Sequence, residues 1–302
     1  MTEILVGIDG SRGAPDALAF AARVAATAGA TLRLASVFPY EDVPSRASSE
    51  AYREYLRSDT QALLDGAAQT VEEVTTTTEA IAHTSPAHAL HALAERTGAA
   101  LVVVGSTHHG PVGRVVPGST GERLLHGASC PVAIVPRGWD AGAIDTIGVG
   151  YEGSPESQAA LSAACQIARR FSAALRVIRV FDASRFASPA LTTVPGWETV
   201  QKDHQAERRE TLELAVASVP PDLRAEPVFV MGSAGRGLAA ESELVDLMVV
   251  GSRGYGPRAA VLLGGVTHTL IRKAACPVIV LPRGSHGLAP LFVTSTAATS
   301  MA

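Results

Sequence analysis

The chain has 302 residues, of which 47% are hydrophobic and 18% charged, a composition typical of globular proteins. Its formal net charge of −4 argues against a nucleic-acid or anionic-membrane partner, because either would require a basic surface. Its three cysteines are too few and too scattered for a disulfide framework or a cysteine-rich zinc site, and we expect them to be buried filler.

The first residues carry no charged segment followed by an apolar one, so no signal peptide is evident. No stretch approaches 18 apolar residues without a charge, which argues against a membrane span. We therefore expect a soluble, cytoplasmic protein.

The first half of the chain alternates between strand and helix patterns. Gly29 is placed to end an alanine-rich helix, and Pro86 is placed to open a later one. The run 101–104 is apolar throughout, as is typical of a strand buried on both faces. In chain order we predict strand 4–9, helix 15–28, strand 31–37, helix 48–68, strand 71–80, helix 86–98, strand 101–104, helix 118–126 and strand 132–135.

The second half follows the same order of elements. Here we predict strand 146–151, helix 155–171, strand 175–180, helix 197–218, strand 226–230, a helix from 234, strand 247–250 and a last strand at 278–281. Strands that alternate with helices predict the α/β class, with a parallel sheet covered by helices on both faces.

Short motifs recur between the halves. The segment 6–11 returns at 149–154, an offset of 143, and the Cys-Pro-Val triplet at 130–132 returns at 276–278, an offset of 146. A period this long indicates a duplicated domain. We predict domains at 1–138 and 143–284, joined by a short linker, and a disordered tail at 285–302 because that segment is small, polar and aperiodic.

Ligands of open parallel sheets bind outside the carboxyl ends of the strands. That rule points to three pairs of equivalent positions: Asp9 and Glu152, Val37 and Val180, and the glycine-rich loops 105–119 and 251–265. Backbone N–H groups of a glycine-rich turn that leads into a helix form a concave donor set suited to phosphate.

At these loops the chain resembles the universal stress protein family, as two tandem copies that cover residues 1–284. The family's nucleotide motif is Gly, two residues, Gly, nine residues, then Gly followed by Ser or Thr. In repeat one the four motif positions are Gly105, His108, Gly118 and Ser119, so the second glycine is replaced. In repeat two they are Gly251, Gly254, Gly264 and Gly265, so the closing hydroxyl is missing.

The resemblance implies an adenine-nucleotide α-hydrolase-like, Rossmann-like fold for each repeat. It also implies that Asp9 and Glu152 face the ribose, and that Val37 and Val180 face the adenine, of bound ATP. Mg²⁺ would bridge the phosphate oxygens, since all-protein cages for this ion are unusual. Because each copy departs from the motif at one position, we expect two sites of unequal affinity, and the resemblance further implies a homodimer of whole chains.

Three other kinds of site, a dinucleotide site, a P-loop and a histidine metal site, are less well supported by the sequence. Residues 148–153 match a dinucleotide fingerprint and Asp182 could contact a ribose, but that match lies partly inside a strand and is absent from repeat one. Neither loop has the Gly-Lys-Ser or Gly-Lys-Thr ending of a P-loop. We read the histidines of repeat one as surface or loop residues rather than metal ligands, since repeat two matches none of them: His83, His88, His91, His108 and His109.

The leading hypothesis is an ATP-binding regulatory protein of stress adaptation. Its rivals are an enzyme that cleaves or transfers from ATP, and a nucleotide-free interaction protein. Phosphoryl transfer needs a positioned water or acceptor, a metal ion and positive charge at the leaving oxygen. Asp9 and Glu152 are instead expected near the sugar, away from the terminal phosphate. We therefore expect no enzyme, or at most slow hydrolysis.

The last strand of each repeat, 132–135 and 278–281, is short and apolar and is expected at a sheet edge. An open apolar edge favours aggregation, and pairing two such edges would satisfy their free backbone groups. We predict that the repeats pair there as a pseudo-dimer.

Overall fold

The protein is described by a computed structural model that places residues 2–40, 50–106, 119–185, 197–252, 264–284 and 287–292. The elements of repeat one are β1 (Glu3–Gly7), α1 (Ala14–Ala28), β2 (Thr31–Phe38), α2 (Glu50–Ala68), β3 (Thr76–Ala82), α3 (Pro86–Thr97), β4 (Leu101–Gly105), α4 (Ser119–Leu125) and β5 (Val132–Val135). Those of repeat two are β6 (Thr146–Gly150), α5 (Pro155–Phe171), β7 (Ala174–Phe181), the 3₁₀ turn η1 (Ala183–Arg185), α6 (Trp197–Ala217), β8 (Ala225–Met231), α7 (Ala234–Glu241), β9 (Leu247–Gly251), α8 (Gly265–Ile271), β10 (Val278–Leu281) and α9 (Ala289–Phe292).

Helix ends follow the signals in the sequence. Helices α1 and α3 carry a proline in their first turn, and each is followed by a glycine in the left-handed region, Gly29 and Gly98, both at φ 64°. Helix α5 is capped by Ser154, whose side-chain oxygen accepts a hydrogen bond from the Ser157 N–H. The α/β class and the alternation of strands with helices are confirmed.

All ten strands form one sheet in the order β3-β2-β1-β4-β5-β10-β9-β6-β7-β8. Each repeat contributes five parallel strands, and the repeats join where β5 pairs with β10 in antiparallel register, with Ala133 opposite Ile279. Every residue of both joining strands is buried. The predicted pairing of the two last strands is therefore confirmed.

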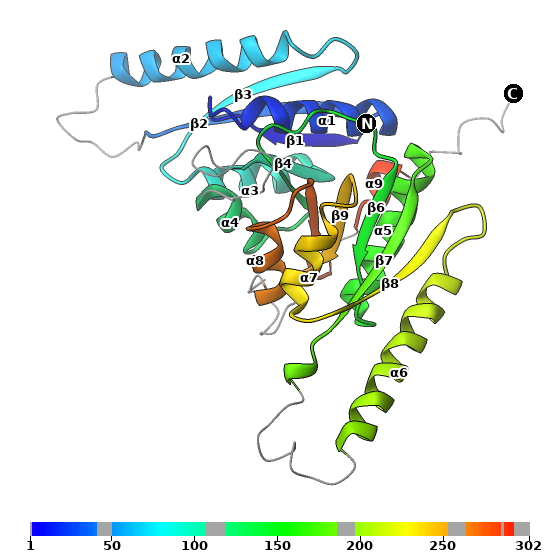
Figure 1. Ribbon diagram of the computed structural model, residues 1–302. Helices are drawn as coiled ribbons and strands as arrows, with labels where there is room; N and C mark the ends of the chain where they lie inside the picture. Colours follow the sequence, from blue (N-terminus) through cyan, green and yellow to red (C-terminus); the bar gives the residue numbers. More distant parts are fainter. Residues whose placement is uncertain are drawn as a thin grey trace, which may run out of the picture.

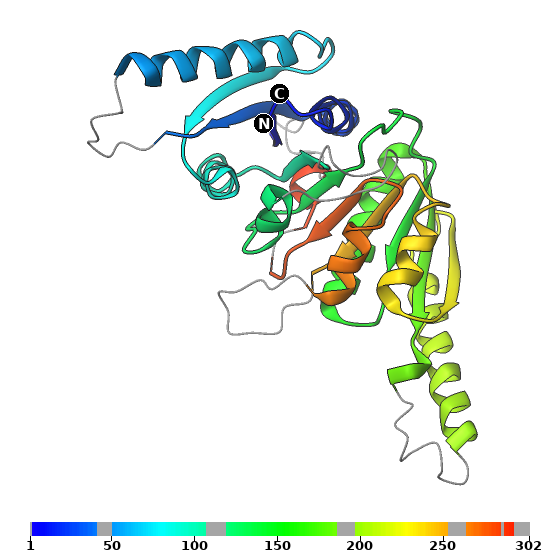
Figure 2. The same ribbon diagram turned by 60° about the vertical axis from the view of Figure 1, so that its left-hand side comes forward.

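Helices cover both faces of this sheet (Figures 1 and 2). One hydrophobic core contains residues of α1, α2, α5, α6 and α9, and the other contains residues of α3, α4, α7 and α8. Helices α2 and α6 lie beside the outer strands at opposite ends of the sheet (Figure 1). None of the helices within the described ranges is long and apolar enough to span a membrane.

Two element predictions differ from the structure. Strand β3 begins at Thr76 rather than at 71, because residues 71–75 form the connection from α2, and the β-branched threonines that follow pair with β2 from Leu32 onward. Part of the expected disordered tail is ordered: Leu288, Leu291 and Phe292 are buried, and α9 packs on α5. The remainder of that tail lies outside the described residues.

Candidate functional site

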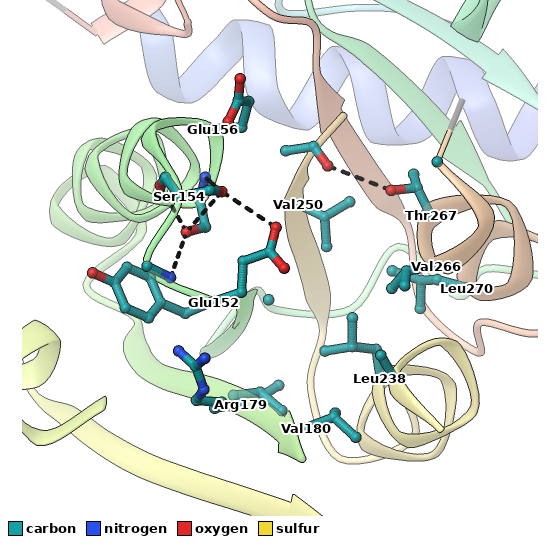
Figure 3. Close-up of a pocket in the computed structure, with 18 of the residues that line it drawn as sticks. Glu152, Ser154, Glu156, Arg179, Val180, Leu238, Val250, Val266, Thr267 and Leu270 are labelled. Atoms are coloured by element: carbon teal, nitrogen blue, oxygen red, sulfur yellow. Dashed lines mark hydrogen bonds between the residues drawn. The ribbon is translucent and has the colours of Figure 1, made fainter. Parts of the chain in front are cut away.

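A cavity of about 760 Å³ opens at the carboxyl ends of the adjacent strands β9, β6 and β7 of repeat two (Figure 3). Its lining comes from these strands, from the first turn of α5, and from α6, α7 and α8. The lining residues are Gly150, Tyr151, Glu152, Gly153, Ser154, Glu156, Ser157, Ile178, Arg179, Val180, Phe181, Asp182, Arg208, Ala234, Leu238, Val250, Gly251, Gly264, Val266, Thr267, Leu270 and Arg283.

The turn from β6 to α5 holds an acid at the mouth of the cavity. The Ser154 hydroxyl donates to Glu152 Oε1 at 3.3 Å, and Ser154 Oγ accepts from the Ser157 N–H at 3.2 Å. The Gly153 N–H donates to Ser157 Oγ at 3.1 Å. The carboxylate of Glu152 is therefore oriented by a hydroxyl that also caps a helix, and Figure 3 shows it pointing into the open space.

An apolar wall lies opposite the acid. It is formed by Val180 near the end of β7, Leu238 of α7 and Val250 of β9, which approach one another in Figure 3. Leu238 and Val250 are buried, and Val180 is half-buried and belongs to the same core. A flat apolar ring fits such a wall, because few polar atoms there would be desolvated.

The glycine-rich end of the cavity contains Gly251, which ends β9, and Gly264, which precedes α8. A Cβ atom at Gly251 would lie 2.7 Å from the Glu156 carbonyl oxygen, so the close approach of α5 requires glycine there. Sequence reasoning missed Thr267, which is buried and lines the cavity. Its hydroxyl donates to the Gly251 carbonyl oxygen at 3.4 Å, and it follows the motif by only two residues.

Three arginines line the same cavity. Arg283 Nε lies 3.2 Å from Glu156 Oε1. Arg179 of β7 is only 7% exposed, and its Nη1 has no hydrogen-bond partner within the described part of the chain. Burial, and next the neighbouring charge of Arg208, lower the pKa of the Arg179 guanidinium from its usual value. Sequence reasoning missed Arg179, and its charge inside an apolar strand pattern was the available signal.

A profile of the universal stress protein family matches residues 1–136 and again residues 143–282. The chain belongs to this family. A universal stress protein of Mycolicibacterium smegmatis is 31% identical over 291 residues, which cover 92% of this chain and 96% of that protein. One from Mycobacterium tuberculosis strain CDC 1551 is 28% identical over 287 residues, which cover 94% and 97% respectively.

The fold is likewise that of a solved relative. A universal stress protein from Archaeoglobus fulgidus superposes with a TM-score of 0.70 at 19% identity, covering 93% of this chain and 98% of that one. At this identity the likeness supports the fold alone. The chain is thus a tandem universal stress protein with two repeats in one polypeptide.

The predicted site residues of the second universal stress protein repeat come together in part. Glu152, Val180, Gly251 and Gly264 all line the cavity. Gly265 is the first residue of α8, directly after the lining residue Gly264. Gly254 lies outside the described residues.

In the first repeat, Asp9 follows β1, Val37 lies near the end of β2, and Gly105 ends β4. Asp9 Oδ1 accepts a hydrogen bond from the Ser11 N–H at 2.9 Å, which fixes the turn into α1. Ser119 begins α4, whereas the predicted phosphate contacts His108 and Gly118 lie outside the described residues.

The alternative motifs find structural explanations. Gly148 and Gly150 of the dinucleotide-like segment lie inside β6, where Cβ atoms would meet Met248 and Val250 at about 3 Å. His91 Nε2 lies 2.8 Å from the Leu124 carbonyl oxygen, a backbone partner from the neighbouring helix. Across the described ranges, no three metal-ligating side chains gather.

Proposed function

We propose that the chain is an ATP-binding regulatory module of the stress response, with one nucleotide position in each repeat. The observation that carries this proposal is the single cavity in which Glu152, Val180, Gly251 and Gly264 meet. Its volume of about 760 Å³ lies within the range of about 300–1,000 Å³ usual for small-molecule sites. Cytoplasmic location and a homodimer of whole chains belong to the same proposal, on the family resemblance.

The residues present fit the three parts of ATP. Adenine would pack on the apolar wall of Val180, Leu238 and Val250, and the ribose hydroxyls would donate to the Glu152 carboxylate. The phosphates would lie at the glycine-rich end, which Gly251 and Gly264 line and where Gly264 carries no side chain to narrow the cavity. Bound Mg²⁺ would neutralise phosphate charge while keeping most of its water ligands.

This arrangement favours binding over catalysis. Glu152 is held by Ser154 on the side of the cavity proposed for the sugar, and Glu156, beside the glycine-rich end, is paired with Arg283. Nucleotide occupancy would instead change the contacts between the loops and the helices that follow them. We propose that such a change alters conformation or partner affinity, and that hydrolysis is slow.

The substitution Gly264→Val tests the proposal. Gly264 has φ −63° and ψ 145°, a conformation that a β-branched residue adopts without strain, so the fold should persist while the side chain narrows the cavity. Calorimetry with MgATP should show two bound nucleotides in the wild type and one in the variant. Gly66→Ala, on α2 with nothing within 4 Å of the added atom, is the control.

A Gly264→Val variant that binds as many nucleotides as the wild type would contradict the assignment of this cavity. Acid release followed by mass spectrometry provides an independent check. The protein purified from cells should release an adenine nucleotide, and the same preparation should turn over added ATP only slowly.

A further inference from the structure

One corner of the repeat-two cavity is not used by the nucleotide positions proposed above. It lies between the turn at Gly153, strand β7 and helix α6, and it contains Arg179 and Arg208. Side chains alternate across a strand, so Arg179 points to the face opposite Val180, toward α5 and α6. A Cβ atom at Gly153 would lie only 4.0 Å from Arg179 Nη1, which places the guanidinium beside the turn that carries Glu152 (Figure 3).

One nitrogen of the Arg179 guanidinium is buried without a hydrogen-bond partner among the described residues, although Glu152 and Glu207 lie near enough to attract the charge. Arg179 is 93% buried, and within the described chain its Nη1 has no hydrogen-bond partner. Arg208 adds a like charge from α6, while Glu152 is engaged by the Ser154 hydroxyl and Glu207 is exposed to water. A buried guanidinium nitrogen without a hydrogen-bond partner is costly, so Arg179 Nη1 marks a place where an anion would bind favourably.

The first repeat lacks the arginine at this strand position. Ser36 occupies the position of Arg179, since the pairings of β1 with β2 and of β6 with β7 have the same register. The turn at Gly10 and helix α2 bound a smaller cavity of about 360 Å³, whose lining includes Ile8, Leu18 and Leu63 but not Ser36. The strand position of Arg179 is therefore cationic in repeat two and uncharged in repeat one.

We propose that Arg179 and Arg208 form a second phosphate-binding position in repeat two, separate from the glycine-rich end of the cavity. The phosphate is either free or carried on the ribose of an adenosine phosphate, because Glu152 and the proposed ribose position lie beside the corner. Only the second source rests on the proposed nucleotide function. The guanidinium Nη1 of Arg179 donates to a phosphate oxygen, and Arg208 supplies the second charge.

The test compares the wild type with Arg179→Ser, which introduces the residue of repeat one, and with Arg208→Gln. Arg169→Ser is the matched control, because it removes one arginine of the same repeat from an exposed pair with Asp222. In one arm, thermal midpoints are measured in inorganic phosphate and in sodium chloride of equal ionic strength. In the other arm, calorimetry compares adenosine 2′-phosphate with adenosine 5′-phosphate.

We expect a phosphate-specific rise of the midpoint, or tighter binding of the 2′-phosphate, in the wild type and the Arg169→Ser control. In the arm that shows specific binding, Arg179→Ser should weaken the affinity for the phosphate by about tenfold to a hundredfold, as expected for the loss of a hydrogen bond to a charged group. Arg208→Gln should weaken it by less. The inference is overturned if neither arm shows specific binding, or if both cavity variants bind phosphate as tightly as the wild type.

The two proposals fail separately. Gly264→Val should abolish MgATP binding to repeat two and leave the effect of inorganic phosphate intact. Phosphate stabilisation without ATP binding in the wild type would reject the proposed function and support the cationic corner. ATP binding with no phosphate effect in either arm would support the proposed function and reject the cationic corner.

Discussion

Gly105 and Gly251 each end a buried strand against the first turn of a helix. A Cβ atom at Gly105 would clash with the Gly13 carbonyl oxygen, and one at Gly251 would lie 2.7 Å from that of Glu156. Both obstacles are backbone atoms, which cannot rotate away. These glycines therefore satisfy the close packing of helix on strand.

Gly105→Ala should lower the free energy of unfolding by about 1–3 kcal/mol, the usual cost of overpacking a core. Gly66→Ala, in the interior of α2 with open space around it, should raise it by about 0.5–1 kcal/mol through helix propensity. Urea denaturation of the two variants measures both effects. A Gly105→Ala protein as stable as the wild type would show that α1 shifts readily away from β4.

Cys165 and Cys276 are buried as expected, whereas Cys130 is only half-buried. Its partial desolvation nevertheless raises the pKa of the thiol from 9.0 to about 11, which should lower its reactivity. At pH 8 the thiolate fraction should be about a hundredfold below that of an exposed cysteine. Iodoacetamide at pH 8 should therefore modify Cys130 slowly in the native protein and rapidly in urea, as peptide mapping would measure. Equal rates in both conditions would contradict the burial of this side chain.

The same shift gives a pH dependence of stability. Well below pH 9.0 the Cys130 thiol is protonated in both the folded and the unfolded chain, so it does not make the free energy of unfolding depend on pH. Between 9.0 and about 11 only the unfolded chain releases the proton, and stability should fall. Replacing Cys130 with alanine should make the loss in this range smaller in urea titrations.

At the scale of elements, the sequence predicts the helices and strands that are marked by residues within or next to them. Proline and glycine mark both ends of α1 and α3, and the apolar run of β4 is continuous. Helix α9 was not predicted because it has only four residues, and its burial depends on contacts with the distant helix α5 that no local pattern encodes. Pairs between distant elements, such as Arg33 with Glu79, are likewise invisible before the fold is known.

The joining strands should be the most protected part of the sheet. Strands β5 and β10 are fully buried and have neighbours on both sides, whereas β3 and β8 each have one neighbour. Native-state hydrogen exchange should find amides of Val132–Val135 and Val278–Leu281 opening only with global unfolding. Those of β3 and β8 should open at lower free energy, and exchange of β5 as fast as β3 would contradict the pairing.

At the scale of the whole molecule, duplication makes one continuous sheet from two sets of five parallel strands. The sequence predicted which strands would meet, because their apolar edges needed partners. It could not predict the contacts that result from this pairing, such as that of Arg272 Nη1, directly after α8, with Glu122 Oε1 of α4 at 3.0 Å. Both groups are partly exposed, so this ion pair between the repeats should contribute less than about 1 kcal/mol.

The two repeats should bind MgATP with unequal affinity. Repeat one has Asp9 and the motif hydroxyl of Ser119, whereas repeat two has the longer acid Glu152, the buried hydroxyl of Thr267 and no side chain at Gly265. These differences change the hydrogen bonds to both the sugar and the phosphates. Calorimetry of the full chain should therefore require two classes of site, and an isotherm that fits two identical sites would contradict the expectation.

Gly265→Ser identifies which class belongs to repeat two. The substitution completes the family motif, and the added Cβ atom meets nothing within 4 Å, so the structure should accept it. A hydroxyl bonded to a charged phosphate oxygen contributes about 1.5–3 kcal/mol, which corresponds to about a tenfold or greater gain in affinity. Only one class of site should bind MgATP more tightly. It should be the class that Gly264→Val removes, because Gly264 and Gly265 are adjacent at the start of α8 in repeat two.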